Sequence, residues 1–162
     1  SSLFGARLAA MLGLPYGFAS HFAPQALRQA VAIYRHEFQP SEQQAEPYVI
    51  AGVNVIAADT DEDAQAQHLT VRRARVRMFV QKGITLTDEK ADEILASPQG
   101  AQIAEMMRYS AIGTPGDVKE FLDGFAEHAD ADELMVVAAS PGIEARLRSL
   151  ELLADVAGLV PA

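Results

Sequence analysis

The stretch Tyr48–Ala57, which reads YVIAGVNVIA, decides the fold class of this chain. It is an almost unbroken apolar run rich in valine and isoleucine, and such runs are typical of strands buried on both faces of a parallel sheet. Two shorter apolar runs, Leu14–Ala19 and Glu133–Ala138, predict two further buried strands. Helix-like segments separate the three strands, so the sequence predicts an α/β fold with a parallel sheet.

Helices are predicted where apolar residues recur every three or four positions, or where capping residues mark a helix start. Thr114, Pro115 and Asp117 form a clear start of this kind, with threonine as N-cap and proline at the first helical position. In chain order the predicted helices are Ser2–Leu12, Pro24–Phe38, Glu62–Gln81, Asp88–Ala96, Gln99–Tyr109, one from Pro115 and one after Gly142.

One connection is too long for a plain alternation of strands and helices. About 75 residues separate Ala57 from Leu134, whereas a crossover between parallel strands needs a few tens of residues. We therefore expect a helical insertion of about residues 61–112 within a single domain that comprises residues 1–162.

The composition excludes several classes of protein. With 13 Lys+Arg against 22 Asp+Glu, the 162 residues carry a formal net charge of −9, which disfavours binding to nucleic acid. The absence of cysteine excludes thiol nucleophiles, iron–sulfur clusters and cysteine-ligated zinc. No apolar run approaches the roughly 20 residues of a membrane span, and no leader with a cleavage site is visible. We expect a cytoplasmic protein without membrane or nucleic-acid partners.

Two short polar segments are candidate binding sites. Ser1 and Ser2 precede a helix, where free backbone N–H groups, the helix dipole and two hydroxyls suit a phosphate; the alternative is a simple N-cap, which the residues alone favour. Ala19, Ser20 and His21 follow a predicted strand, and ligands of parallel α/β folds bind at the carboxyl ends of strands. There the imidazole is available to bind a ligand or carry a proton, or else it satisfies its own loop.

Other polar residues have simpler interpretations. The turn Ala58–Asp61 is expected to cap the following helix, and His36, His68 and His128 are expected on solvated helix faces. No histidine pair has the HExxH spacing of a zinc hydrolase, and the nucleotide-binding motifs GxGxxG and GxxxxGK[ST] are absent. The GxSxG elbow of α/β-hydrolases is also absent. These patterns identify no metal ligand and no catalytic residue.

Four stretches together resemble the luciferase-like, flavin-dependent monooxygenase family, whose fold is a (β/α)8 barrel. They are SSLFGARLAAMLGLPYGFASHFAPQAL at 1–27, YVIAGVNVIAADTDEDA at 48–64, AIGTPGDVKEFL at 111–122 and DELMVVAASPGIEARLRSLELLA at 132–154. The resemblance is to the carboxyl-terminal half of the family. It implies about strands five to eight of the barrel, with the helical insertion before the last strand.

The resemblance also implies a chemistry. The family binds reduced FMN and uses O2 to oxidise a small organic substrate such as a long-chain aldehyde, and a separate flavin reductase is a possible partner. By position, Ser1 and Ser2 match the loop that helps hold the flavin phosphate. Ala19, Ser20 and His21 match a strand end near the isoalloxazine ring. The insertion matches a mobile lid, and the catalytic groups are expected on strands that this chain lacks. The substrate itself stays open.

Two alternatives remain beside this interpretation. One is a flavin-binding relative without turnover, and the other is an oxidoreductase that uses a deazaflavin in place of FMN. A full barrel needs about 250 residues, and the chain opens at Ser1 without methionine, so we expect a fragment that is inactive by itself. Half a barrel exposes sheet edges and apolar surface, from which we expect either a homo-oligomer or a remnant of a longer chain.

Overall fold

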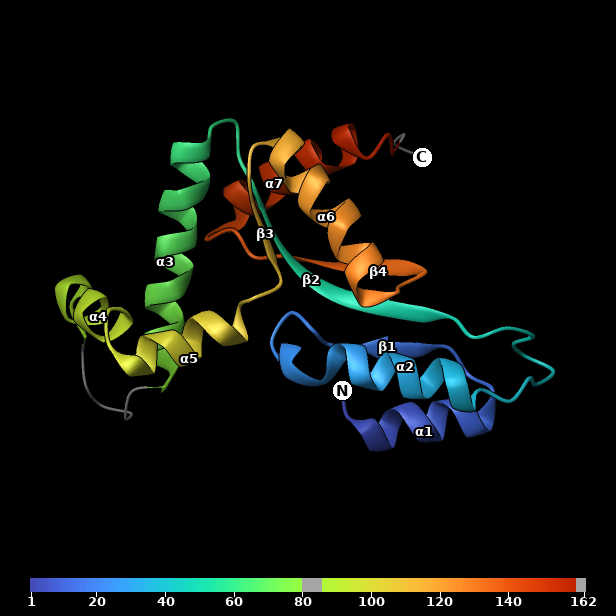
Figure 1. The fold of residues 1–162 in the computed structure, drawn as a ribbon. Coiled ribbons are helices and arrows are strands. Elements are labelled where there is room, and N and C mark those ends of the chain that lie inside the picture. Colours follow the sequence, from blue (N-terminus) through green and yellow to red (C-terminus); the bar gives the residue numbers. More distant parts are fainter. Residues whose placement is uncertain (80–85, 160–162) are drawn as a thin grey trace.

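The computed structural model describes residues 1–79 and 86–159 (Figure 1). Four strands form one sheet, and helices pack around it. In chain order the elements are α1 (Leu3–Leu12), β1 (Tyr16–Phe18), the 3-10 turn η1 (Pro24–Ala26), α2 (Leu27–Glu37), β2 (Val49–Ala57), α3 (Asp61–Phe79), α4 (Asp88–Leu95), α5 (Pro98–Met106), β3 (Ser110–Gly113), α6 (Pro115–Ala129), β4 (Glu133–Ala138) and α7 (Ile143–Val156).

Strand β2 is the centre of the sheet, and every pairing in it is parallel. On one edge, β1 pairs with the first part of β2 (Tyr16 opposite Val49) and β3 pairs with the last part (Ser110 opposite Asn54). The other edge pairs with β4. Eight of the nine residues of β2 are buried, as its continuous apolar sequence predicts. The predicted α/β class with a parallel sheet is therefore confirmed.

Strand β3 was not predicted from the sequence. The expected helix Gln99–Tyr109 ends at Met106, and Ser110–Gly113 then runs alongside β2. Only four residues form the strand, which is too short for a periodic pattern to distinguish it from a helix end. The long connection between β2 and β4 thus consists of α3, α4 and α5, a returning strand and α6. In Figure 1 helices α3, α4 and α5 lie together to one side of the sheet.

Strand β4 occupies its predicted range, but the expectation that it is buried was wrong. Leu134 and Val136 pack against the core below α6, whereas Met135, on the opposite face, is 54% exposed. The apolar sequence is that of a strand covered on both faces, yet within the described residues only one face is covered. Apolar side chains are also exposed along the outer faces of α1 (Phe4, Leu8, Met11, Leu12) and α7 (Ile143, Leu147, Leu150).

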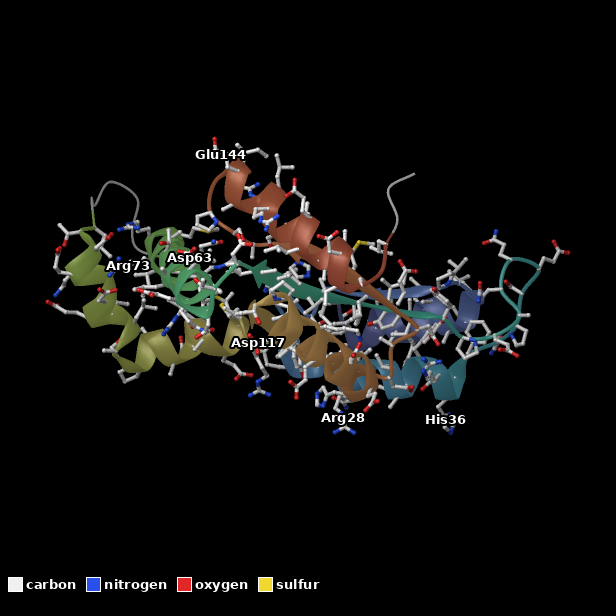
Figure 2. The ribbon with its side chains drawn as sticks, turned by 90° about the horizontal axis from the view of Figure 1, so that it is seen from above. Arg28, His36, Asp63, Arg73, Asp117 and Glu144 are labelled. Atoms are coloured by element: carbon white, nitrogen blue, oxygen red, sulfur yellow. The ribbon has the colours of Figure 1, made fainter. Side chains whose placement is uncertain are left out.

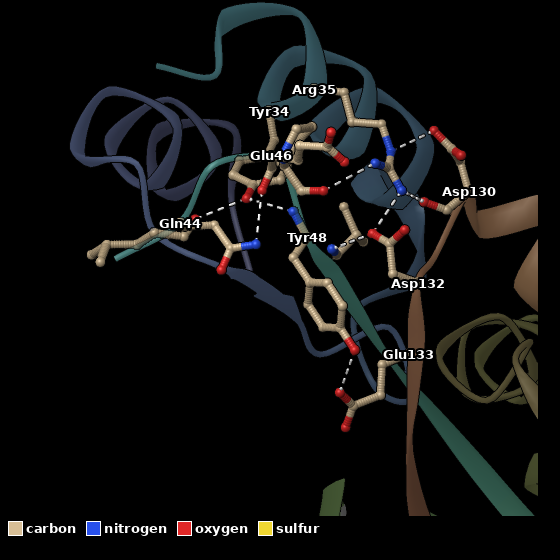
Figure 3. Close-up of polar contacts among 11 residues, drawn as sticks. Tyr34, Arg35, Gln44, Glu46, Tyr48, Asp130, Asp132 and Glu133 are labelled. Atoms are coloured by element: carbon tan, nitrogen blue, oxygen red, sulfur yellow. Dashed lines mark hydrogen bonds and ion pairs between the residues drawn. The ribbon is translucent and has the colours of Figure 1, made fainter. Parts of the chain in front are cut away.

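The amino-terminal end of the sheet is held by a polar cluster (Figure 3). Arg35 on α2 pairs with Asp130 and Asp132, at 2.7 and 2.9 Å, just before β4. Asp132 also accepts a hydrogen bond of 2.7 Å from the backbone N–H of Val49, the first residue of β2. This cluster fixes the start of β2 and the start of β4. At the opposite, carboxyl end of the sheet, the surface is formed by the loops that follow the strands.

Replacing Asp132 by alanine should lower the free energy of unfolding by about 1–3 kcal/mol, because it leaves the buried N–H of Val49 without a hydrogen-bond acceptor and removes a partner of Arg35. Urea denaturation of the full chain measures this loss. Asp123→Ala is the matched control, since Asp123 makes only an exposed pair with Lys119, and its effect should stay within about 0.5 kcal/mol. Equal losses in the two variants would contradict the role given to Asp132.

Several predicted helix boundaries are confirmed. Ser2 is the N-cap of α1, and Gly13 ends that helix in the left-handed conformation with φ of 60°. Thr114 and Asp117 form the capping box of α6, and hydrogen bonds from Thr114 lower the pKa of the Asp117 carboxyl. For the predicted helix Glu62–Gln81, Val80 and Gln81 lie outside the described residues. No helix within 1–79 or 86–159 has both the length and the apolar character to cross a membrane.

Candidate functional site

The loops at the carboxyl end of the sheet bring the predicted site residues into one region. The turn of residues 19–22 follows β1, and the first residues of the chain lie against it. In parallel α/β proteins ligands bind at this carboxyl end of the strands. The opposite, amino-terminal end of the sheet is occupied by the Arg35 cluster, so the two ends of the sheet differ in chemistry as well as in position.

Ser1 and Ser2 have different partners. The hydroxyl of Ser1 accepts a hydrogen bond of 2.5 Å from the backbone N–H of Ala19, which joins the first predicted segment to the second. The hydroxyl of Ser2 accepts from the N–H of Gly5 at 3.0 Å, so it acts as the N-cap of α1. No acidic residue lies in the first turn of α1. The amino end of this helix therefore faces the turn after β1 without a carboxylate that would repel an anion.

Ser20 is an anchor of the turn. It is fully buried, and its hydroxyl donates a hydrogen bond of 2.6 Å to the carbonyl of Gly52 on β2. Because this hydroxyl is already engaged inside the protein, any contact of Ser20 with a ligand would have to come from its backbone.

His21 lies half-buried at the end of the turn. Its Nδ1 is buried and has no hydrogen-bond partner within residues 1–79 and 86–159, and its ring meets that of Phe22 edge-on at 5.1 Å. Phe22 is 49% exposed. Burial, and to a smaller degree the positive charge of Arg75, lower the pKa of His21 below its usual value of 6.5. The imidazole is therefore neutral at pH 7, able to donate from one ring nitrogen and accept at the other.

Gly52 makes room for this imidazole. A Cβ atom at Gly52 would lie 2.5 Å from Nδ1 of His21 and 3.3 Å from the carbonyl oxygen of Phe18. No side chain larger than hydrogen fits between the central strand and the turn unless His21 moves. Glycine inside a strand often marks such a close approach.

Asn54 is a site residue that sequence reasoning missed. It is 5% exposed, and its Nδ2 donates to the carbonyl of His21 at 2.7 Å and to the hydroxyl of Ser110 at 3.4 Å. That hydroxyl in turn donates to the carbonyl of Met107 at 2.7 Å. One buried amide thus joins the turn after β1 to the returning end of the α3–α5 segment. The available signal was a single polar residue within the apolar run YVIAGVNVIA.

The turn after β2 has the structural role predicted for it. Thr60 accepts a hydrogen bond from the N–H of Asp63 and so caps α3, while Asp59 pairs with Arg148 on α7 at 2.5 Å. That ion pair lowers the pKa of the Asp59 carboxyl.

The three other histidines do not all behave as expected. His36 and His128 are exposed, as predicted, and His128 shares a hydrogen bond of 3.1 Å with the hydroxyl of Tyr109. The expectation that His68 is solvated was wrong, because this residue is half-buried. Burial lowers its pKa, and the charge of Arg72 lowers it further. The polar helix face that carries His68 packs toward the sheet instead of toward solvent.

A cavity of about 430 Å3 lies elsewhere, between α6 and the residues before β3. Tyr109, Phe121, Phe125 and His128 are among the residues that line it. Size alone would direct attention there, whereas the unpartnered imidazole and the helix amino terminus gather at the strand ends. We place the candidate site at the strand ends because specific polar groups converge there.

The family model described as luciferase-like monooxygenase matches residues 1–132. The chain belongs to this family. Among curated relatives, the chain is 38% identical over 160 residues to the uncharacterized protein YvbT of Bacillus subtilis, and 36% identical over 158 residues to a luciferase-like monooxygenase of Escherichia coli. Each alignment covers 96% of this chain but 47% of the relative. This luciferase-like chain therefore spans about half the length of these relatives.

Solved structures agree with this assignment. The structure of apo-MsnO8 superimposes with a TM-score of 0.82 at 34% identity, over all of this chain and 50% of that protein. The oxygenating constituent of 3,6-diketocamphane monooxygenase from Pseudomonas putida, in complex with FMN, superimposes with a TM-score of 0.53 at 16% identity, over 97% of this chain and 46% of that protein. The second likeness shows the fold alone. The luciferase-like chain thus has an α/β fold that matches about half of such structures.

Proposed function

We propose that this chain is the carboxyl-terminal half of a luciferase-like, flavin-dependent monooxygenase. In this proposal β1, β2 and β4 correspond to barrel strands six, seven and eight, and β3 is an additional short strand in the connection between the last two. Ser1 and Ser2 then stand in the loop after strand five. The hydrogen bond of Ser1 with Ala19 carries the proposal, because it joins two segments that the family resemblance assigns to one flavin site.

The residues present fit a flavin at this edge. The amino end of α1, with Ser1 and Ser2, offers N–H groups and hydroxyls to a phosphate. The backbone of Ala19 and the unpartnered imidazole of His21 offer polar contacts to a heteroaromatic ring, and exposed Phe22 offers a stacking surface. When bound, reduced FMN supplies the electrons with which O2 oxidises a small organic substrate.

The chain's own residues then hold and shield the site. Ser20 and Gly52 fasten the turn to β2, and neutral His21 can exchange a hydrogen bond at either ring nitrogen. Residues 61–112, which include α3, α4 and α5, act in this proposal as a lid that keeps water from the reacting centre. Salt bridges from Arg73 to Asp88 and Asp92, at 2.9 and 2.5 Å, keep α3 and α4 together as one unit.

The exposed apolar faces of α1 and α7 indicate that another protein surface covers them. Each presents a stripe of apolar side chains at helical spacing, a surface that soluble monomers rarely leave open. We propose that the other half of the barrel, or a second copy of the chain, covers them. A flavin reductase would deliver the reduced cofactor.

A flavin titration of the full-length parent protein tests the proposal. We expect FMN or reduced FMN to bind, and O2 uptake to depend on flavin in the presence of an aldehyde or alkane, while this chain alone shows no turnover. The parent's failure to bind either flavin and to consume O2 would refute the proposal. Tight binding without oxidation of any substrate would favour a non-catalytic relative, and deazaflavin absorbance in the purified protein would favour that cofactor.

A further inference from the structure

Helix α3 carries four arginines in two environments. At α4, Arg73 pairs with Asp88 and Asp92, and Arg77 pairs with Asp88 (Figure 2 labels Arg73). The hydrogen bonds that Arg73 donates to Asp92 raise the pKa of Arg73. Arg72 and Arg75 are half-buried, yet neither forms an ion pair with any carboxylate of residues 1–79 and 86–159. The chain carries 22 acidic residues against 13 basic ones, so the absence of a direct ion-pair partner at these two positions does not come from a shortage of acids.

The unpaired arginines share a helix face with His68. The three residues are spaced four and then three apart, which places them on one side of a helix. The same side carries Ala64, buried against the end of β2. The Nε of Arg72, a hydrogen-bond donor, is buried without a partner in the described part of the chain. Polar atoms in such positions normally have partners, so this cluster is incomplete.

The cluster faces the candidate site. Helix α3 packs against β3, where Val71 of the helix and Ile112 of the strand belong to one apolar cluster. Ser110, the first residue of β3, is joined through Asn54 to the carbonyl of His21, so α3 lies alongside the strand that supports the turn after β1. In agreement with this placement, the charge of Arg75 adds to burial in lowering the pKa of His21. The charge of Arg72 acts in the same way on His68. The charge of Arg72 also contributes to lowering the pKa of Asp92, although the hydrogen bonds of Asp92 with Arg73 are the larger cause. Asp92 is thus already engaged by another arginine.

Half-burying two guanidinium groups without a counter-ion costs free energy, which a bound anion would recover. We propose that Arg72 and Arg75, with His68 beside them, form a binding site for a small oxyanion next to the His21 turn. The guanidinium fork suits the paired oxygens of a carboxylate or a phosphate. Resting on the proposed function, we assign this site to an anionic group on the organic substrate, which would hold the substrate's remaining carbon chain toward the turn.

Anion binding can be tested on the full chain without any flavin. We expect isothermal titration to detect both sodium phosphate and sodium hexanoate, and Arg72→Gln or Arg75→Gln to weaken binding by about tenfold. Tighter binding of hexanoate would identify a carboxylate, and tighter binding of phosphate would identify a phosphate ester. Arg28→Gln is the matched control: Arg28 lies exposed on α2 (Figure 2), makes no ion pair within the described residues, and its loss changes the net charge equally.

A second readout reports the location of the anion. In NMR titrations of the unsubstituted chain we expect added anion to raise the pKa of His21 and His68, because negative charge offsets the two arginines. The NMR signals of exposed His36 should not move when the anion is added. Absence of binding, or equal loss in Arg28→Gln, would overturn the anion site. If this chain binds the anion but its full-length parent shows neither flavin binding nor flavin-dependent O2 uptake, the proposed function is overturned and the anion site stands.

Discussion

Replacing Gly52 by alanine is expected to lower the free energy of unfolding by about 1–3 kcal/mol, because the new methyl group would overlap the His21 ring. The Cβ would lie 2.5 Å from Nδ1 of His21, and it would also be in tight contact, at 3.3 Å, with the carbonyl oxygen of Phe18. The imidazole must therefore turn out of its place. Urea denaturation measures the loss of stability, and the NMR signals of His21 report the displacement.

Gly124→Ala is the matched control for this substitution. Gly124 lies in α6, and a Cβ there would meet no atom within 4 Å. Alanine favours helix over glycine, so this variant should be more stable by about 0.5–1 kcal/mol, with His21 unchanged. A Gly52→Ala protein with full stability and unmoved His21 signals would contradict the close approach described above. In the full-length parent, the same variant should weaken flavin binding if the proposed site is correct.

Asn54→Asp should have the other large effect, and its size should depend on pH. The new carboxyl would be almost fully buried against the carbonyl of His21, so its folded-state pKa would rise above the usual value of about 3.9. A group with a raised pKa holds its proton more tightly in the folded state. Below about pH 4, where the protonated carboxyl can still donate to the carbonyl of His21, the free energy of unfolding of the variant should therefore match that of the unsubstituted chain. As the pH rises, the variant should lose stability.

At pH 7 we expect this deficit to reach about 3 kcal/mol, and to level off above the folded-state pKa of the new carboxyl. Denaturation of variant and parent at a series of pH values measures it. Asn54→Leu removes the same hydrogen bonds without a titrating group, so its deficit should not vary with pH, and Gln25→Glu adds an equal charge at an exposed position. A pH-independent deficit in Asn54→Asp would contradict the buried environment assigned to Asn54.

The sequence predicted those features that arise from local patterns. The apolar run of β2 and the capping residues Ser2, Thr114 and Asp117 are signals carried by neighbouring residues, and the structure confirms each of them. Strand β3 was missed because its four residues acquire their conformation by pairing with β2. This pairing joins residues far apart in the sequence, since Ser110 lies opposite Asn54, which is 56 residues earlier in the chain.

The site itself was only partly predictable, for the same reason. The sequence predicts Ser1 and Ala19 as parts of two separate segments, and only the folded chain brings them into contact. The sequence places Asn54 within a strand, but only the folded chain shows that its amide joins the turn after β1 to the start of β3. Polar sequence neighbours predict a solvated His68, whereas the packing of α3 half-buries it. Each of these outcomes depends on tertiary contacts that no local pattern contains.

The edge of β2 that β1 and β3 share has a mechanical consequence. The first strand uses this edge up to Ala51 and the second begins at Asn54, and in the interval the carbonyl of Gly52 is taken by the Ser20 hydroxyl. Neither β1 nor β3 can extend toward the other along β2 without displacing the turn that bonds Gly52. A shift of the α5–β3 segment along β2 would therefore displace Ser20 and His21. The position of this segment and the geometry of the site thus depend on the same stretch of the β2 backbone.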